Sequence, residues 1–142
     1  MESEKVADAS GGDYPDIVPT NEGVAKRHTA ACAERGCLVV LPLEKELFVD
    51  IDTFQALGYF HANVRRLGDL YESHTLRPSP SRKDGRFHIV VQLSRPVRDA
   101  FERIMLQALL GSDLSREILS WREATAGVVT PTVFFEKLPT AK

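Results

Sequence analysis

Hydrophobic and polar residues follow regular patterns along the chain, and these patterns predict its secondary structure. Two short apolar runs, at 37–43 and 47–52, are typical of strands. Between Phe54 and Tyr71 the apolar residues recur at steps of three and four, which predicts a helix with one buried face. Thr53 precedes this segment and is a suitable N-cap, because its hydroxyl can accept a hydrogen bond from the first turn.

The second half of the chain predicts three more strands and two more helices. The strands are expected at 73–77, 87–93 and 131–136. One helix is expected to open at Arg95 and Pro96 and to end at Gly111, and Ser112 is expected to cap the next. The expected core faces of these helices carry Val97, Phe101, Ile104, Met105, Ala108, Leu114, Ile118 and Trp121. The element order β-β-α-β-β-α-α-β predicts an α+β fold whose antiparallel or mixed sheet has helices packed on one face.

The composition is typical of a globular protein that is neither secreted nor inserted in a membrane. The chain has 142 residues, of which 43% are hydrophobic and 27% charged, and this suits one domain with a core. No apolar run approaches the roughly 20 residues of a membrane-spanning helix, and the first residues lack the features of a signal peptide. We therefore expect an intracellular protein, cytoplasmic or nuclear, with a flexible acidic arm at 1–25 and one α+β domain at 26–142.

The charge is unevenly distributed, although the net charge is only −2. Residues 1–76 carry seven basic and thirteen acidic side chains, whereas residues 77–142 carry eleven basic and seven acidic ones. A local positive region in a chain that is not basic throughout favours an anionic ligand over a broadly basic surface.

The two cysteines form part of an H-x3-C-x4-C pattern made by His28, Cys32 and Cys37. The pattern offers three possible zinc ligands but no evident fourth. In a chain expected to be intracellular, the cysteines are expected to be reduced and partly buried, and the role of the three residues stays open.

Asp50 and Asp52 end the second predicted strand as a closely spaced carboxylate pair. Because side chains alternate along a strand, residues two apart project from the same face. Adjacent carboxylates repel one another unless a cation lies between them, and Mg²⁺ or Mn²⁺ prefers such oxygen ligands. The alternative is a strand end whose aspartates cap the next helix and pair with arginines.

A loop rich in hydroxyl and basic side chains leads directly into the predicted strand at 87–93. Such side chains, together with exposed amides, are suited to binding phosphates, and His88 at the start of the strand can hydrogen-bond a phosphate or a sugar. The alternatives are a solvated basic loop and a half-buried histidine. The candidate phosphate-binding residues are Ser79, Ser81, Arg82, Lys83, Arg86 and His88. Asp113 adds one carboxylate between the last two predicted helices.

These segments together resemble the archaeo-eukaryotic primase superfamily over about residues 37–136. The family's hydrophobic-Asp-hydrophobic-Asp motif matches Val49 to Asp52, and its strand-opening histidine, which follows a phosphate-binding loop, matches His88. The best match to its third carboxylate is Asp113. Arg86 stands where the family prefers a small residue, and the chain is shorter than most active members.

The resemblance implies a minimal or divergent primase-like nucleotidyltransferase with an RNA-recognition-motif-like core. Asp50, Asp52 and Asp113 would be catalytic and would hold Mg²⁺ or Mn²⁺, and the loop residues with His88 would bind a nucleoside triphosphate. Its partners would be nucleoside triphosphates, a nucleic acid template and other protein subunits, with no membrane. A partial or inactive relative is the alternative within the family.

Two alternative functions dispense with catalysis. One is a nucleic-acid- or nucleotide-binding module, and the other is an interaction subunit of a larger replication-type assembly. The binding module would contact phosphates through Arg77, Arg82, Lys83, Arg86, Arg95 and Arg98. Exposed aromatic side chains for base stacking are not expected, because Phe54, Phe60, Phe101 and Trp121 fall on predicted core faces.

Overall fold

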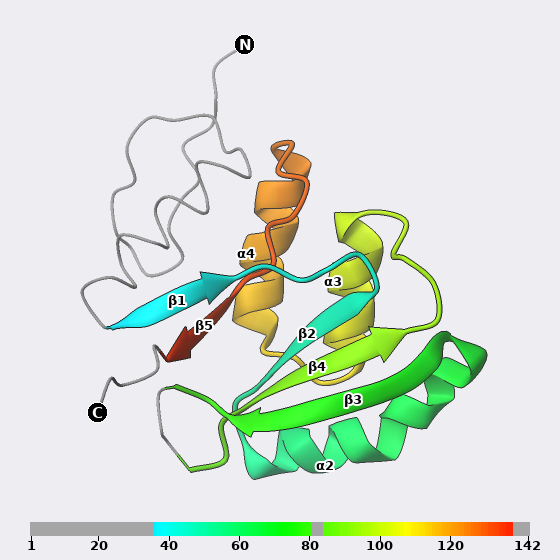
Figure 1. The fold of residues 1–142 in the computed structure, drawn as a ribbon, viewed down its shortest axis with the longest axis vertical. Helices are drawn as coiled ribbons and strands as arrows, with labels where there is room; N and C mark the ends of the chain where they lie inside the picture. The colour runs from blue at the N-terminus through cyan, green and yellow to red at the C-terminus, as the bar shows by residue number, and fades with distance from the viewer. Residues whose placement is uncertain (1–35, 81–83, 138–142) are drawn as a thin grey trace.

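The computed structural model describes residues 36–80 and 84–137, and it confirms the α+β class and the predicted order of strands and helices (Figure 1). A 3-10 segment, η1, extends the first helix. The elements are β1 (Cys37–Val40), β2 (Glu46–Ile51), α2 (Phe54–Asn63), η1 (Val64–Leu70), β3 (Tyr71–Pro78), β4 (Phe87–Leu93), α3 (Ala100–Leu109), α4 (Leu114–Thr125) and β5 (Phe134–Lys137). No helix within the described ranges is long and apolar enough to cross a membrane.

The strands form a three-stranded antiparallel sheet and a separate two-stranded ribbon. The sheet has the order β2-β4-β3, and α2 connects its two outer strands across the central one. The register pairs Asp50 with His88, so these two side chains lie on the same face of the sheet. The ribbon pairs β1 with β5. Because β5 does not join the three strands, the finer expectation of an RNA-recognition-motif-like sheet stays a prediction.

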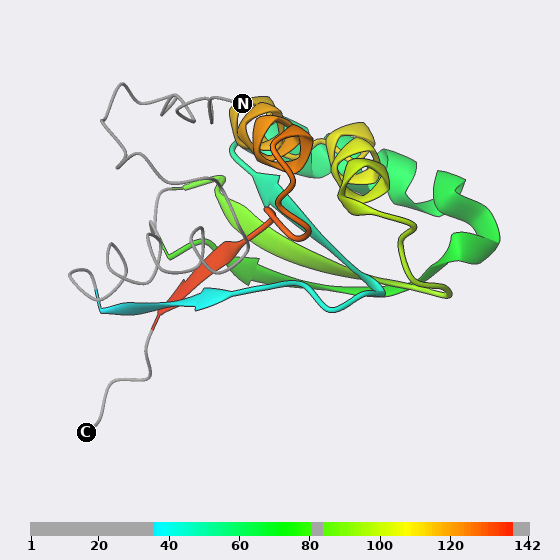
Figure 2. The same cartoon turned by 90° about the horizontal axis from the view of Figure 1, so that it is seen from above.

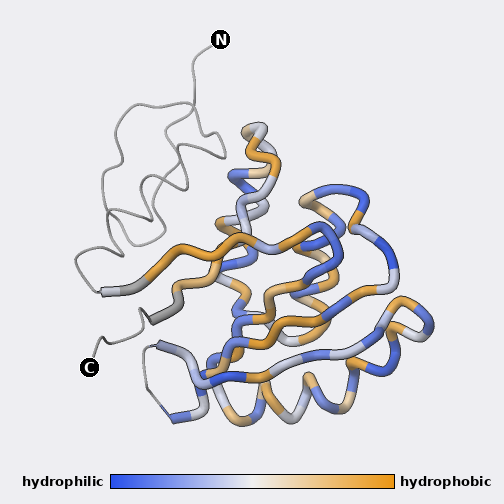
Figure 3. Tube along the Cα trace, in the orientation of Figure 1, coloured by the Kyte–Doolittle hydropathy of each residue, from blue (hydrophilic) through white to orange (hydrophobic). Residues whose placement is uncertain are grey.

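The main core lies between the sheet and the helices, which occupy one side of the strands (Figure 2). Hydrophobic residues are concentrated along β2 and β4, the two strands that contribute most to this core (Figure 3). The buried core residues are Leu47, Val49, Ile51, Phe60, Val64, Ile89, Val91, Leu93, Leu106 and Leu110. On the other face of the sheet, Phe48 and Val90 pack against Phe134, which attaches the ribbon to the sheet.

Side chains from α3 and its C-terminal turn form hydrogen bonds with the backbone N–H and C=O groups along the free edge of β2. The N–H of Phe48 donates to Gln107 Oε1 at 2.7 Å, and the N–H of Asp50 donates to Ser112 Oγ at 3.0 Å. Farther along, Arg103 donates from Nε to the carbonyl of Glu46 at 3.0 Å. An edge strand normally exposes these groups to water or to another strand. Here they fix the position of the α3–α4 hairpin against the strand that carries Asp50.

Three of the predicted segment boundaries are wrong, each for a local reason. The second helix begins at Ala100 rather than at Pro96, because the Asp99 side chain accepts from the N–H of Glu102 and caps it there. The third helix is capped by Asp113 and not by Ser112, whose hydroxyl is taken up by β2. The apolar run at 37–43 is not a buried strand, since its leucines are exposed and only its first four residues pair.

The predicted core face of α4 is also wrong. Leu114, Ile118 and Trp121 are exposed, and the side of α4 turned toward the protein carries polar residues instead. Glu117 is 2% exposed and accepts hydrogen bonds from Gln107 Nε2 at 2.9 Å and from Ser112 Oγ at 2.6 Å. A carboxylate can be buried in this way only when it is paired or hydrogen-bonded. On α2 and α3, Phe54 and Met105 likewise face solvent.

Candidate functional site

The carboxylates of Asp50, Asp52 and Asp113 converge at the C-terminal end of β2. Each offers an oxygen, and the three oxygens lie within 4.8 Å of one another. Asp50 belongs to β2, Asp52 to the turn before α2, and Asp113 to the α3–α4 junction. Oxygens bound at 2.0–2.1 Å to one Mg²⁺ ion are at most about 4.2 Å apart, so small side-chain rotations suffice for coordination. The cluster can therefore hold a divalent metal ion.

Backbone contacts bring Asp113 to the other two aspartates. Its N–H donates to the carbonyl of Asp50 at 2.8 Å, while Ser112 accepts from the N–H of Asp50 on the same edge. Gly111 makes the turn with a φ of +92°, and a Cβ at this position would lie 3.1 Å from Cδ1 of Tyr59. Both the positive φ and the close approach favour glycine here. A junction between helices can thus supply the third carboxylate of a site built on a strand.

The environment of Asp50 makes ionisation of its carboxyl harder in the metal-free protein than in water. Its pKa is raised to about 6, mainly by burial, with smaller contributions from the charges of Asp52, Asp113 and Glu117 and against the opposing charge of Arg116. A bound cation would reverse this effect, because it stabilises the ionised form. The electrostatics therefore agree with the donor set in favouring a hard cation at this position.

His88 lies beside the aspartates and is neutral at physiological pH. Burial lowers its pKa to about 4, and the charges of Arg116 and Arg77 act in the same direction. Its Nε2 is 3.7 Å from Asp50 Oδ1, but a neutral imidazole makes no ion pair there. The ring stacks in parallel on Phe134 with centroids 3.9 Å apart, and Nδ1 is buried without a hydrogen-bond partner in the described part of the chain. His88 is therefore held rigidly with a polar atom still available.

The basic loop returns close to the aspartates at its C-terminal end. Arg86 Nε is 3.7 Å from Asp52 Oδ1, and Ser79, which is buried, donates its N–H to the carbonyl of Arg86 at 3.0 Å and closes the base of the loop. Gly85 has a φ of +81° and packs against Phe54 at the start of α2. The other candidate residues of this segment, Ser81, Arg82 and Lys83, lie outside the described residues, as do His28 and Cys32.

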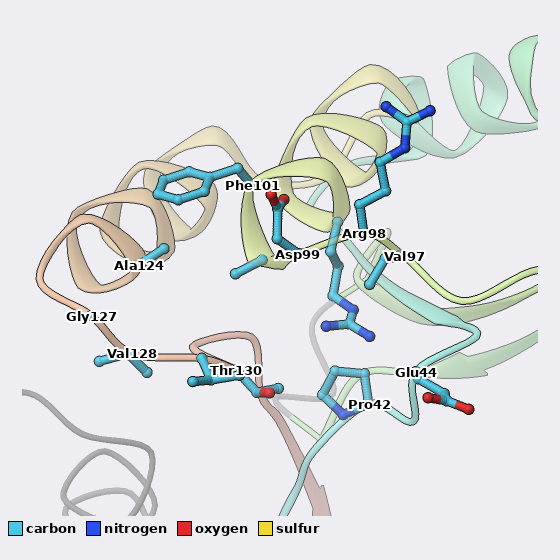
Figure 4. Close-up of a pocket in the computed structure, with 13 residues that line it drawn as sticks. Pro42, Glu44, Val97, Arg98, Asp99, Phe101, Ala124, Gly127, Val128 and Thr130 are labelled. Carbon is cyan, nitrogen blue, oxygen red and sulfur yellow. The ribbon is translucent and has the colours of Figure 1, made fainter.

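Two arginines of the alternative phosphate-binding patch are held elsewhere. Arg95 donates to both carboxylate oxygens of Glu102, at 2.7 and 3.2 Å, and Arg98 Nε lies 3.6 Å from the same side chain. Arg98 also lines a cavity of about 480 Å³ between α3, the end of α4 and the β1–β2 connection (Figure 4). None of the predicted catalytic or nucleotide-binding residues that the structure describes lines that cavity. Arg95 and Arg98 therefore lie at Glu102, whereas Arg86 lies at the aspartate cluster, and the described arginines do not form one patch.

Sequence reasoning missed Arg116, which belongs to the site. Its Nη1 lies 3.3 Å from Ser112 Oγ and 3.6 Å from Glu117 Oε2, whereas its buried Nε and Nη2 have no hydrogen-bond partner among the described residues. Arg116, Asp50 and His88 line a cavity of about 200 Å³. The available signal was the spacing of Asp113, Arg116 and Glu117, which places a polar stripe on one face of α4.

Comparisons with known proteins assign no family to the chain. No family model, no curated protein and no solved structure matches it. A functional interpretation therefore has to rest on the geometry and the chemistry of the site.

Proposed function

We propose that this chain is the core of a primase-type nucleotidyltransferase that uses Mg²⁺ or Mn²⁺. The observation that carries the proposal is the convergence of Asp50, Asp52 and Asp113 beside His88. These residues were selected from a motif pattern in the sequence, and they are separated by up to 63 positions in the chain. Strand geometry accounts for the proximity of Asp50 and Asp52, but nothing in the local sequence requires Asp113 to join them.

The residues have complementary roles in this proposal. The three aspartates would hold the metal, which supplies charge neutralisation for the transferring phosphate and activates the attacking hydroxyl. His88 and Arg86 would bind the nucleoside triphosphate from the loop side of the cluster. Arg116, whose Nε and Nη2 have no hydrogen-bond partner among the described residues, would donate to phosphate oxygens. Such a site works by positioning and charge neutralisation, which suits nucleotidyl transfer.

Metal-dependent nucleotide addition tests the proposal. We expect the full chain to bind Mn²⁺ in calorimetry and to add labelled nucleotides on a single-stranded template only when Mg²⁺ or Mn²⁺ is present. Asp52→Asn should reduce the rate by on the order of 10³-fold, because it removes one ligand from a side chain that is already 41% exposed and hardly supports the fold. Asp69→Asn, at an exposed carboxylate outside the cluster, is the matched control. Absence of metal binding would refute the proposal.

Phe54 offers a base-stacking surface close to the aspartates, contrary to its predicted place in the core. It is 63% exposed, follows Asp52 by two residues, and meets Phe87 edge to face with centroids 6.0 Å apart. Since stacking on an aromatic ring contributes about 1–3 kcal/mol per base, Phe54→Ala should weaken binding of a single-stranded template by roughly 5- to 100-fold. Phe54→Trp should retain binding, and Mn²⁺ affinity should not change in either variant. Fluorescence anisotropy with a labelled oligonucleotide measures the effect.

The non-catalytic binding module is the second candidate, and the exposed ring of Phe54 also fits it. It differs from the first in its dependence on metal. Nucleic acid binding that is unaffected by Asp52→Asn and by removal of divalent ions, without nucleotide addition, would favour the binding module. Its affinity should then fall steeply with added salt, because phosphate contacts release counterions.

A further inference from the structure

The outer face of the α3–α4 hairpin carries large apolar side chains that the protein itself does not cover within the described residues. Five of them are between 49% and 62% exposed: Met105, Leu109, Leu114, Ile118 and Trp121. A sixth, Phe101, extends from α3 toward α4 (Figure 4) and meets Trp121 edge to face with centroids 4.7 Å apart. The two helices lie side by side over one face of the strands (Figure 2).

The spacing of these six side chains places them at three successive levels across the two helices, and at one of these levels Phe101 contacts Trp121. Because α3 and α4 are joined by a short turn and run antiparallel, residues whose numbers add up to nearly the same value lie at about the same level. The pairs are Phe101 with Trp121, Met105 with Ile118, and Leu109 with Leu114, and we call them the apolar ladder. Successive pairs are about one helical turn apart, which is the arrangement that the helices of a four-helix bundle present to its core.

The ladder is suited to a second copy of the same chain. Its five exposed residues present on the order of 500–600 Å² of surface, so two copies would bury about 1,000–1,200 Å², the lower end of what a specific dimer needs. A two-fold interface brings a surface onto its own copy, and like charges within it would repel. None of the six ladder residues is charged. A different partner selected by charge would find nothing on the ladder to recognise.

We propose that two copies of this protein pair through the apolar ladder, so that the α3–α4 hairpins of both copies form a four-helix interface. Helices whose apolar stripes face each other in this way interlock at the spacing of one turn, and the polar inner face of α4 stays turned toward each copy's own sheet. The contact uses none of the three aspartates, although Leu114 directly follows Asp113, and it does not require the proposed catalytic function.

Sedimentation and tryptophan fluorescence test the pairing on the full chain in metal-free buffer. Trp121 is the only tryptophan, so its emission reports on the ladder alone. We expect a concentration-dependent dimer at micromolar concentrations, with Trp121 emission shifting to longer wavelength on dilution. Ile118→Lys should weaken dimerisation at least 10-fold, whereas Leu43→Lys, at an exposed leucine outside the ladder, should not. Circular dichroism should show that both variants are folded.

Three results would overturn the proposal. A monomer at all concentrations with solvent-exposed Trp121 would mean that the ladder has no partner of its own kind. A monomer whose Trp121 emits at short wavelength would mean that another part of the same chain covers the ladder. A dimer that Ile118→Lys leaves intact would mean that copies pair through a different surface.

Discussion

Replacing Asp50 by asparagine is expected to abolish metal-dependent nucleotide addition and, at the same time, to stabilise the metal-free protein. The catalytic loss should reach on the order of 10³-fold or more, because one of the three carboxylates of the aspartate cluster is removed. The gain in stability follows from burial and from three neighbouring acidic groups, which together raise the pKa of Asp50 to about 6. A variant that loses function while gaining stability marks a residue retained for a ligand and not for the fold.

The raised pKa of Asp50 determines whether Asp50→Asn stabilises or destabilises the fold at a given pH. The pKa of Asp50 is 3.8 in an unperturbed chain and higher in the folded protein, so the protonated carboxyl stabilises the fold below pH 4. That stabilisation is lost as the pH rises through 6, and the loss amounts to about 2–3 kcal/mol at neutral pH. Because asparagine cannot ionise, Asp50→Asn should not lose this stability as the pH rises.

Thermal unfolding in EDTA measures the effect. At pH 7.5 we expect Asp50→Asn to raise Tm by about 5–10 °C, and at pH 4 we expect a much smaller difference. Asp69→Asn, at an exposed carboxylate, should change Tm little at either pH. Addition of Mn²⁺ should raise the Tm of the natural protein and leave that of Asp50→Asn unchanged. A variant less stable than the natural protein at both pH values would contradict the prediction.

The sequence could predict the elements that local patterns determine. The apolar run at 87–93 gives β4 with its observed bounds, and Thr53 caps α2 as expected, with its hydroxyl accepting from the N–H of Ala56 at 3.0 Å. The pairing of Asp50 and Asp52 follows from strand geometry in the same way. Asp113 could be selected only through the family motif, because its approach depends on a hydrogen bond to the distant Asp50 carbonyl.

Helical periodicity identified both faces of α4 but could not tell which of them is inside. Apolar residues normally mark the inner face, which predicts that Leu114, Ile118 and Trp121 lie inside. The structure reverses the assignment, because Glu117 has buried hydrogen-bond donors in Gln107 and Ser112. These donors come from α3 and its turn, and their role depends on the unpaired edge of β2. No local pattern contains that information.

Gln107 connects these buried groups, and we expect its loss to have the largest effect on stability. It is fully buried, accepts from the N–H of Phe48 at 2.7 Å, and donates to Glu117 at 2.9 Å. Gln107→Leu would leave a buried N–H without an acceptor and a buried carboxylate with one donor fewer. Each buried polar group left unsatisfied costs about 1–3 kcal/mol, and more when it is charged, so we expect a loss of about 3–5 kcal/mol.

Exchanging the two polar groups distinguishes hydrogen bonding from packing. Gln107→Glu should destabilise the fold by several kcal/mol at pH 7.5, because it places a second buried carboxylate against Glu117, and less at low pH, where one of the two is protonated. The double variant Gln107→Glu/Glu117→Gln restores one carboxylate, one amide and every hydrogen bond between them. Denaturant unfolding should therefore show that the double variant recovers most of the lost stability, and with it the Mn²⁺ affinity that depends on Ser112 and Asp113. A double variant as unstable as Gln107→Glu would mean that side-chain volume, and not the hydrogen-bonded network, fixes α4 against β2.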